Sequence, residues 1–309
     1  MTNPIRILLP DGESQRFAMK VGTMAEGKPF DLLIPKKAGS EEVVAMAADV
    51  DAILAYKAPL TREVIHAARK ARMIQKFGLD CKNIDLAAAR EKGLPVFTRS
   101  LIRNATVADH AMALLLACSR KLIECHRVVA EARYLQYGYQ PKPTAQENVH
   151  HGNWIKVEGV ADLLESTVGI VALGDIGSEI ARRVRPFGPR IGYYQRNRHA
   201  EDIEKSLGVH YLPLDQLIAE SDYRVLGLPM TPATENLLSR ERIARMKPGA
   251  CVINVGRGGL IDEDALCEAL RENRLAAAGL DVFRMEPVPQ TNPLLKLQNV
   301  ILSPHMAGG

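Results

Sequence analysis

Three polar side chains in the last third of the sequence closely follow strand-like apolar runs. Arg257 follows the run at residues 251–255, Glu286 follows the run at 277–282, and His305 follows a third such run. Arginine binds anions through its forked guanidinium, while histidine and glutamate hold and transfer protons. In an open parallel sheet the carboxyl ends of the strands meet at the ligand crevice. We therefore expect these three side chains to converge at one site.

A glycine-containing turn precedes these residues and predicts a dinucleotide site. A strand-like run at residues 167–171 leads through Gly174 and Gly177 into a helical pattern. Gly174 would let the backbone approach a pyrophosphate, Gly177 would let the helix pack closely on the strand, and the helix amino terminus would face the phosphates. Ala172 stands where such a motif usually has its first glycine. The alternative is a tight turn of small residues that binds nothing.

The end of the next strand predicts which dinucleotide is bound. An acidic side chain usually stands there to hold the ribose hydroxyls of NAD, but this chain has the uncharged Gln195, followed by Arg196, Asn197 and Arg198. Guanidinium groups suit the extra phosphate of NADP by charge and geometry. We expect NADP, with NAD as the alternative. In the competing interpretation both arginines are solvated loop residues.

The elements that must position these residues follow from chain length and apolar periodicity. At about 150 residues per domain, 309 residues indicate two domains. In both halves short apolar runs alternate with helical patterns, which predicts two parallel sheets covered by helices on both faces. The expected elements are strands at 5–9, 51–55, 73–76, 95–97, 168–171, 190–194, 223–228, 251–255 and 277–282, helices at 63–71 and 84–92, and one long buried helix at 104–130.

Composition narrows the class of protein. The net charge of +4 is small, and basic residues are interspersed with acidic ones, which argues against nucleic-acid binding. The five cysteines fit neither a close metal pair nor a dense disulfide framework, and we expect no metal site. No apolar run reaches about 18 residues, and none near the amino terminus resembles a signal peptide. We expect a cytoplasmic protein that does not enter a membrane.

In its order of motifs the chain resembles the D-isomer-specific 2-hydroxyacid dehydrogenase family. The resemblance covers nearly the whole chain and rests on the glycine turn and on residues 228–232, 247–249, 254–258, 280–283 and 304–305. It implies two doubly wound α/β domains, with a Rossmann dinucleotide-binding domain at 104–305 inserted in a flavodoxin-like substrate domain at 1–103 plus 306–309. It also implies a homodimer. Relatives generally continue past the equivalent of Gly309, so we expect the natural protein to do so.

The resemblance also implies a role for each candidate site residue. Arg257 would bind the carboxylate and keto oxygen of the substrate, His305 would donate the proton, and Glu286 would pair with His305. The backbone amides at Gly78 and Leu79 would hold the substrate carboxylate. The residues implied to bind the cofactor are Thr106, Gly174, Asp175, Ile176, Gly177, Gln195, Arg196, Asn197, Arg198, Pro229, Val255, Gly256, Arg257, Asp281, His305, Ala307 and Gly308.

The reaction that we expect is the NADPH-dependent reduction of a small 2-keto acid, of the glyoxylate or hydroxypyruvate type, to the D-2-hydroxy acid. One alternative is the NAD-linked oxidation of a phosphorylated hydroxy acid, and another is a non-catalytic protein that senses dinucleotides. Three basic residues of the first domain are relevant to the size and charge of the substrate. Lys76, Arg99 and Arg103 would either add positive charge for a doubly anionic acid or only meet solvent.

Overall fold

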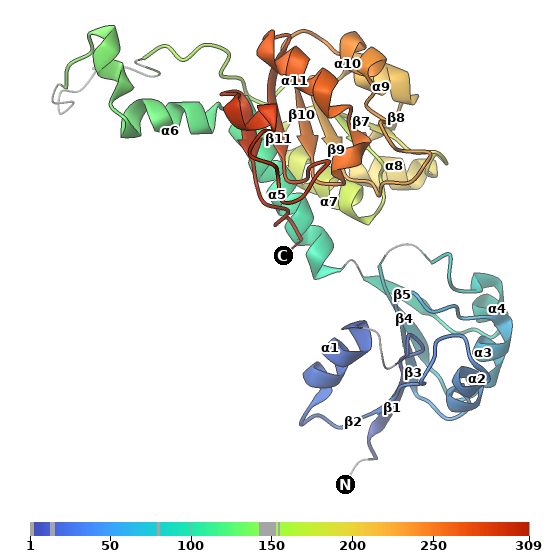
Figure 1. The fold of residues 1–309 in the computed structure, drawn as a ribbon. Coiled ribbons are helices and arrows are strands. Elements are labelled where there is room, and N and C mark those ends of the chain that lie inside the picture. Colours follow the sequence, from blue (N-terminus) through green and yellow to red (C-terminus); the bar gives the residue numbers. More distant parts are fainter. Residues whose placement is uncertain are drawn as a thin grey trace, which may run out of the picture. The chain divides into compact units, whose positions relative to one another are not determined.

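The computed structural model describes residues 3–12, 16–78, 81–99, 101–141, 153 and 155–308. The chain forms two compact units, Met1–Ile102 and Arg103–Gly309 (Figure 1). All paired strands in both units run parallel, as the alternation of strands and helices predicts.

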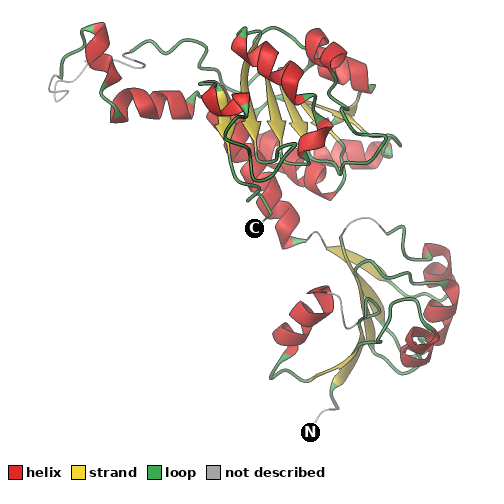
Figure 2. Ribbon diagram, in the orientation of Figure 1, coloured by secondary structure: helices red, strands yellow, loops and turns green. Residues whose placement is uncertain are grey.

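The first unit is built on a five-stranded sheet in the order β2-β1-β3-β4-β5, which is the flavodoxin-like order. Helices α2, α3 and α4 cover one face of this sheet and α1 lies on the other (Figure 2). The elements are β1 (Ile5–Leu8), α1 (Arg16–Ala25), β2 (Phe30–Leu33), α2 (Glu41–Ala47), β3 (Ala52–Ala55), α3 (Arg62–Ala67), β4 (Met73–Phe77), α4 (Leu86–Glu91) and β5 (Val96–Arg99).

The second unit is built on a seven-stranded sheet in the order β12-β11-β10-β9-β6-β7-β8, a Rossmann arrangement whose strand order reverses beside β6. Helices α5, α7 and α8 pack on one face, and α9, α10 and α11 pack on the other. The elements are α5 (Ile102–Ser119), α6 (Leu122–Ala130), η1 (Arg133–Tyr137), β6 (Thr167–Val171), α7 (Asp175–Val184), η2 (Arg185–Phe187), β7 (Arg190–Tyr194), α8 (Glu201–Leu207), β8 (His210–Tyr211), α9 (Leu214–Glu220), β9 (Tyr223–Leu226), α10 (Arg240–Arg245), β10 (Ala250–Asn254), η3 (Gly258–Leu260), α11 (Glu263–Arg271), β11 (Leu275–Leu280), η4 (Pro293–Lys296) and β12 (Val300–Leu302).

The long helix expected at 104–130 is wrong, because two helices occupy that segment. Lys121 has a left-handed backbone with a φ of 49°, and its N–H donates to the carbonyl of Cys118 instead of continuing the i−4 series. Helix α5 therefore ends at Ser119, and α6 starts in a new direction (Figure 1).

The two units divide between Ile102 and Arg103, one residue before the expected boundary. Residues 306–308, expected with the first domain, are grouped with the second unit. The backbone N–H groups of Met306 and Ala307 donate to the carboxylate of Asp281, at 3.0 and 2.9 Å. Gly309 lies outside the described residues.

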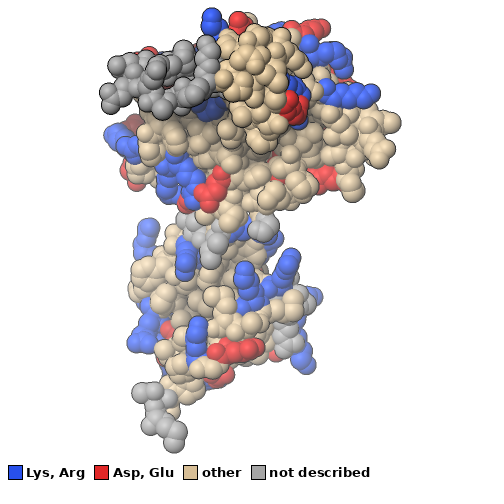
Figure 3. All heavy atoms as spheres, turned by 90° about the vertical axis from the view of Figure 1, so that its left-hand side faces the viewer, with Lys and Arg blue, Asp and Glu red and all other residues tan. Residues whose placement is uncertain are grey.

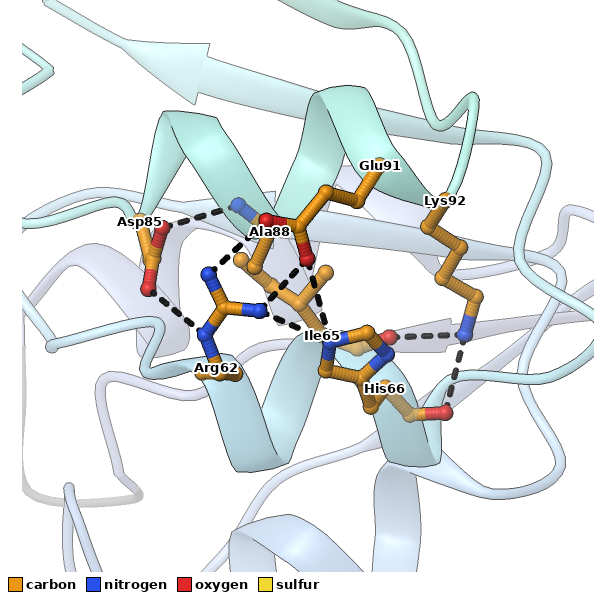
Figure 4. A network of polar contacts seen from close by, with 7 residues as sticks. All are labelled: Arg62, Ile65, His66, Asp85, Ala88, Glu91 and Lys92. Atoms are coloured by element: carbon orange, nitrogen blue, oxygen red, sulfur yellow. Dashed lines mark hydrogen bonds and ion pairs between the residues drawn. The ribbon is translucent and has the colours of Figure 1, made fainter.

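Helices α3 and α4 are joined by a polar network on the surface of the first unit (Figure 4). The guanidinium of Arg62 contacts both carboxylate oxygens of Glu91, and Lys92 donates to the carbonyls of Ile65 and His66 at 2.7 and 3.0 Å. Lys92 thereby caps the carboxyl end of α3. The network fixes one helix against the other.

The charges on the surface are mixed. On the face drawn in Figure 3, Lys and Arg side chains lie interspersed with Asp and Glu. No helix in the described part of the chain is both long enough and apolar enough to cross a membrane. The same residues contain no cluster of three side chains suited to hold a metal ion.

Candidate active site

The loops that follow β10 and β11 lie directly on each other, and Gly258 makes this approach possible. A Cβ added to Gly258 would lie 1.9 Å from the carbonyl carbon of Phe283, and one added to Gly256 would lie 2.7 Å from the carbonyl oxygen of Leu228. Any side chain at either position would displace backbone. Gly258 therefore brings the segment that carries Arg257 against the segment that leads to Glu286, and Gly256 brings it against the loop after β9.

Glu286 and His305 form a direct pair at the ends of neighbouring strands. His305 Nδ1 lies 2.6 Å from Glu286 Oε2, and the N–H of Phe283 donates to Glu286 Oε1 at 3.0 Å. Both side chains remain open to solvent, with exposed fractions of 45% for His305 and 35% for Glu286. The imidazole is thus oriented by a carboxylate and still accessible to a small molecule.

The pKa of the Glu286 carboxyl lies below its ordinary value. Burial acts in the opposite direction and favours the neutral acid, but hydrogen bonds from His305 and Phe283 and the nearby charges of His305 and Arg257 outweigh it. Arg257, Glu286 and His305 thus follow the neighbouring strands β10, β11 and β12, and Glu286 and His305 are in direct contact.

Arg257 is exposed, and its guanidinium is only partly used within the chain. One N–H donates to the carbonyl of Gly256 at 2.6 Å, and no carboxylate among the described residues forms an ion pair with it. Asn254 fixes the turn beneath, because its amide donates to the carbonyl of Arg257 at 2.9 Å and accepts from the N–H of Gly256 at 3.0 Å. The remaining donors of the fork suit an anionic ligand.

Asp281 is fully buried and holds the segment that carries His305. Its carboxylate accepts from the Ser303 hydroxyl at 2.7 Å and from the N–H groups of Met306 and Ala307. Its backbone carbonyl accepts from the N–H of His305 at 2.8 Å, where the φ of His305 is 54°. The structure thus gives Asp281 a positioning role that the sequence did not predict.

The glycine turn between β6 and α7 has the geometry of a phosphate-binding turn. A Cβ on Gly177 would lie 2.1 Å from the carbonyl oxygen of Ala172, whereas one on Gly174 would meet nothing within 4 Å. Gly177 therefore serves close packing, and Gly174 faces open space where backbone and ligand can approach. Gly174 provides no side-chain cap, so the first N–H groups of α7 remain suited to an anion. These residues fit the pyrophosphate of a dinucleotide.

Ala172 and Asp175 flank this turn, and both affect how a phosphate would bind there. Ala172, which replaces the usual first glycine, has a left-handed φ of 75°. Asp175 at the start of α7 accepts a hydrogen bond from the Asn104 amide at 3.1 Å. Its carboxylate suits the helix dipole but carries the same sign of charge as a phosphate.

After β7, Arg196 and Arg198 differ in their hydrogen bonding within the chain. Arg198 donates to both oxygens of Glu204 at 2.9 Å, and the Tyr193 hydroxyl donates to the same carboxylate at 2.6 Å. The hydrogen bond from Arg198, with that from Tyr193, lowers the pKa of Glu204 to about 2. Arg196 is exposed and makes no hydrogen bond or ion pair with the part of the chain that is described. The hydrogen bonds from Arg198 to Glu204 cannot be predicted from the polar sequence of α8. Because they engage Arg198, Arg196 is the guanidinium that remains available to a ligand.

The other expected cofactor residues all lie in the second unit. Gln195 is half-buried and donates to the carbonyl of Asn197, which is exposed. Thr106 is half-buried on α5 and donates to the carbonyl of Arg103, while Val255 and Ala307 are buried. Also in this unit are Ile176 in the first turn of α7, the exposed Pro229 after β9, and Gly308 against Arg103 and Val107.

In the first unit the structure describes only part of the expected carboxylate-binding loop. Leu79 lies outside the described residues, and the N–H of Gly78 donates to the carbonyl of Arg99 at 2.8 Å. Lys76 is buried, and its ammonium donates to the carbonyls of Tyr56 and Phe77. Lys76 thus ties together the ends of β3 and β4, whereas the side chains of Arg99 and Arg103 are exposed.

Comparison with known proteins identifies the family. The model for the D-isomer specific 2-hydroxyacid dehydrogenase NAD binding domain matches residues 112–307. A glyoxylate reductase of Korarchaeum cryptofilum is 38% identical over 266 residues, which cover 86% of this chain and 75% of the relative. A hydroxypyruvate reductase of Thermotoga maritima is 34% identical over 271 residues, which cover 86% of this chain and 80% of the relative. A D-3-phosphoglycerate dehydrogenase of Methanocaldococcus jannaschii is 36% identical over 269 residues, which cover 86% of this chain but 47% of that relative.

Solved structures agree with this assignment. The crystal structure of a Pyrococcus horikoshii protein matches with a TM-score of 0.61 and 27% identity, covering 99% of this chain and 86% of the other. A glyoxylate reductase from Paecilomyes thermophila matches with a TM-score of 0.56 and 27% identity, covering 99% and 89%. The chain therefore belongs to the D-isomer-specific 2-hydroxyacid dehydrogenases, which are oxidoreductases that use a nicotinamide dinucleotide.

Proposed function

We propose that this enzyme reduces a small 2-keto acid of the glyoxylate or hydroxypyruvate type to the D-2-hydroxy acid, with NADPH as the favoured cofactor. The observation that carries the proposal is the Glu286–His305 pair, together with the position of Arg257 after the neighbouring strand β10. The named activities of the glyoxylate and hydroxypyruvate reductases among its relatives support the substrate class.

The chemistry divides among these residues as follows. The bound nicotinamide cofactor supplies a hydride to the keto carbon. Arg257 binds the substrate carboxylate and stabilises the charge that develops on the keto oxygen. Glu286 accepts from Nδ1 of His305, so Nε2 is the nitrogen from which His305 donates a proton to that oxygen. One hydride and one proton together convert the keto group to a hydroxyl group.

The preference for NADPH rests on Gln195 and Arg196. An uncharged side chain at position 195 does not repel a 2′-phosphate, and the exposed guanidinium of Arg196 has no partner among the described residues. We expect Arg196→Ala to raise the KM for NADPH about tenfold, with little change for NADH. Arg182→Ala, on the exposed surface of α7, is the control. An unchanged ratio of the two KM values would contradict the preference.

The same proposal assigns the first unit to the substrate. Residues 1–103 with 306–309 would form the substrate domain, and backbone amides at Gly78 and Leu79 would hold its carboxylate. This requires the N–H of Gly78 to exchange the carbonyl of Arg99 for the substrate. We also propose a cytoplasmic homodimer built on the dinucleotide domains.

The proposal is tested by measuring turnover of a panel of 2-keto and 2-hydroxy acids with NADPH, NADH and their oxidised forms. Reduction of glyoxylate or hydroxypyruvate, lost in His305→Ala with retained cofactor binding, is the expected result. Turnover of a phosphorylated hydroxy acid with NAD would favour the second candidate, which the similarity to a phosphoglycerate dehydrogenase supports. Cofactor binding without turnover of any acid would refute catalysis and favour a dinucleotide sensor.

A further inference from the structure

A polar network lies behind the segment that carries His305. His110 of α5 is 19% exposed, and its Nε2 lies 2.8 Å from Ser303 Oγ and 3.3 Å from Asp281 Oδ1. The Ser303 hydroxyl donates to the same Asp281 oxygen at 2.7 Å. His110 of α5 and Ser303 at the end of β12 thus meet at the buried carboxylate of Asp281, which stands at the end of β11.

The direction of each hydrogen bond follows from this arrangement. The hydroxyl hydrogen of Ser303 is used on Asp281, so the Ser303 oxygen can only accept from His110. His110 must therefore carry its hydrogen on Nε2 and donate it to Ser303 Oγ, while Asp281 Oδ1 lies at ion-pair distance, 3.3 Å, from the same nitrogen. The carboxylate accepts further from the N–H groups of Met306 and Ala307.

These contacts bear on the catalytic histidine because Asp281 holds the backbone on both sides of it. Ser303 precedes His305, Met306 and Ala307 follow it, and the carbonyl of Asp281 accepts from the N–H of His305 itself. His305 adopts a left-handed backbone, which a non-glycine residue keeps only where its surroundings enforce it. Loss of one donor leaves a buried acceptor short of partners and loosens the segment.

We propose that His110 is a positioning residue that, through Ser303 and Asp281, fixes the backbone at 303–307 and so holds the imidazole of His305 against Glu286. His110 forms no hydrogen bond or ion pair with Glu286 or His305, so it acts only through the network. The activity measurements below rest on the proposed function, but the spectroscopic one does not.

The test compares His110→Leu with His110→Gln, whose amide nitrogen can replace the donor at Nε2. A displacement of His305 by about 1 Å would lower kcat by about 100-fold, and we expect a fall of 10- to 100-fold in His110→Leu with at most a small change in KM. His110→Gln should recover most of the loss. Ser303→Ala combined with His110→Leu should lose little more than the larger single loss, since both break one network. His66→Leu, on the surface of the first unit, is the matched control.

A second readout needs no substrate. In enzyme labelled with 15N at its eight histidines, the ring signals of His305, assigned with His305→Gln, should shift in His110→Leu and return in His110→Gln. Unchanged His305 signals and an unchanged kcat in His110→Leu, even with a lowered melting temperature, would overturn the proposal. If the shift appears in His110→Leu but the wild-type enzyme reduces no keto acid, the proposed function is refuted and the positioning role stands.

Discussion

At the scale of single residues, the pair of Glu286 and His305 defines the chemistry. A carboxylate oxygen can only accept, so Glu286 requires the hydrogen of His305 on Nδ1 and leaves Nε2 available for the proton donation that we propose. The second carboxylate oxygen is used by the N–H of Phe283. Glu286 is thereby anchored to the backbone while it orients the imidazole.

Replacement of Glu286 by glutamine removes this anchoring. A glutamine replaces one of the two oxygens by an NH2 group, which cannot accept, so either His305 or Phe283 loses its acceptor in this arrangement, and glutamine carries no charge to favour an imidazolium. We expect Glu286→Gln to lower kcat about 100-fold, measured by the oxidation of NADPH with a keto acid. A variant with wild-type kcat would show that Glu286 is not required.

The same carboxylate makes a pH-dependent contribution to stability. Because the pKa of Glu286 is lowered in the folded protein, its contribution is fully present above the ordinary pKa and is lost as pH falls through the folded value. We therefore expect the free energy of unfolding of the wild type to fall more steeply than that of Glu286→Gln as pH drops below about 4.5. Urea unfolding of both proteins at a series of acidic pH values measures the difference.

Asp175 sets a balance between folding and cofactor binding. Its carboxylate at the amino end of α7 stabilises the helix dipole but repels a phosphate at the same turn. We expect Asp175→Asn to bind the dinucleotide about threefold to tenfold more tightly, and to lower the free energy of unfolding by about 0.3 to 1 kcal/mol. Fluorescence titration and urea unfolding measure the two effects. Weaker binding in this variant would mean that the phosphates do not lie near this carboxylate.

At the scale of elements, the loops after β10 and β11 depend on a backbone contact at Gly258. A methyl group there would overlap the backbone of Phe283, so Gly258→Ala must separate the loops. We expect this variant to lose about 1 to 3 kcal/mol of unfolding free energy and at least 100-fold in kcat/KM. Gly174→Ala is the matched control, because its methyl group meets no protein atom within 4 Å. It should fold normally yet bind the dinucleotide more weakly.

Most of the strands, the two parallel sheets and the positions of Arg257, Glu286 and His305 after strands could be predicted from the sequence, but β2 and β8 were not expected. Each depends on apolar runs and on the rule that parallel strands end at one edge. The break at Lys121 could not be predicted, because no glycine or proline marks it. The bidentate ion pair between Arg198 and Glu204 could not be predicted either, since their six-residue separation does not reveal the direction of either side chain. His110 left a faint signal, as a histidine directly before the apolar run at residues 111–118 of α5.

At the scale of the whole molecule, α6 carries apolar side chains that are exposed. No residue of this helix is buried, and Leu122 and Val129 are 57% and 59% exposed. Exposed apolar side chains grouped on one element are typical of protein interfaces. In the homodimer proposed above, a second copy of the chain would cover these side chains and remove them from water.

Leu122→Glu combined with Val129→Glu tests this assignment. Burial of two added carboxylates at an apolar interface is strongly unfavourable, so the double variant should dissociate to monomers at concentrations where the wild type is a dimer. Sedimentation velocity measures the two states. Leu86→Glu, which places a charge on an exposed leucine of the first unit, is the control and should leave the dimer intact. Because the catalytic residues and their hydrogen-bond partners come from one chain, the Glu286–His305 pair should persist in the monomer. A double variant that stays dimeric would place the interface elsewhere.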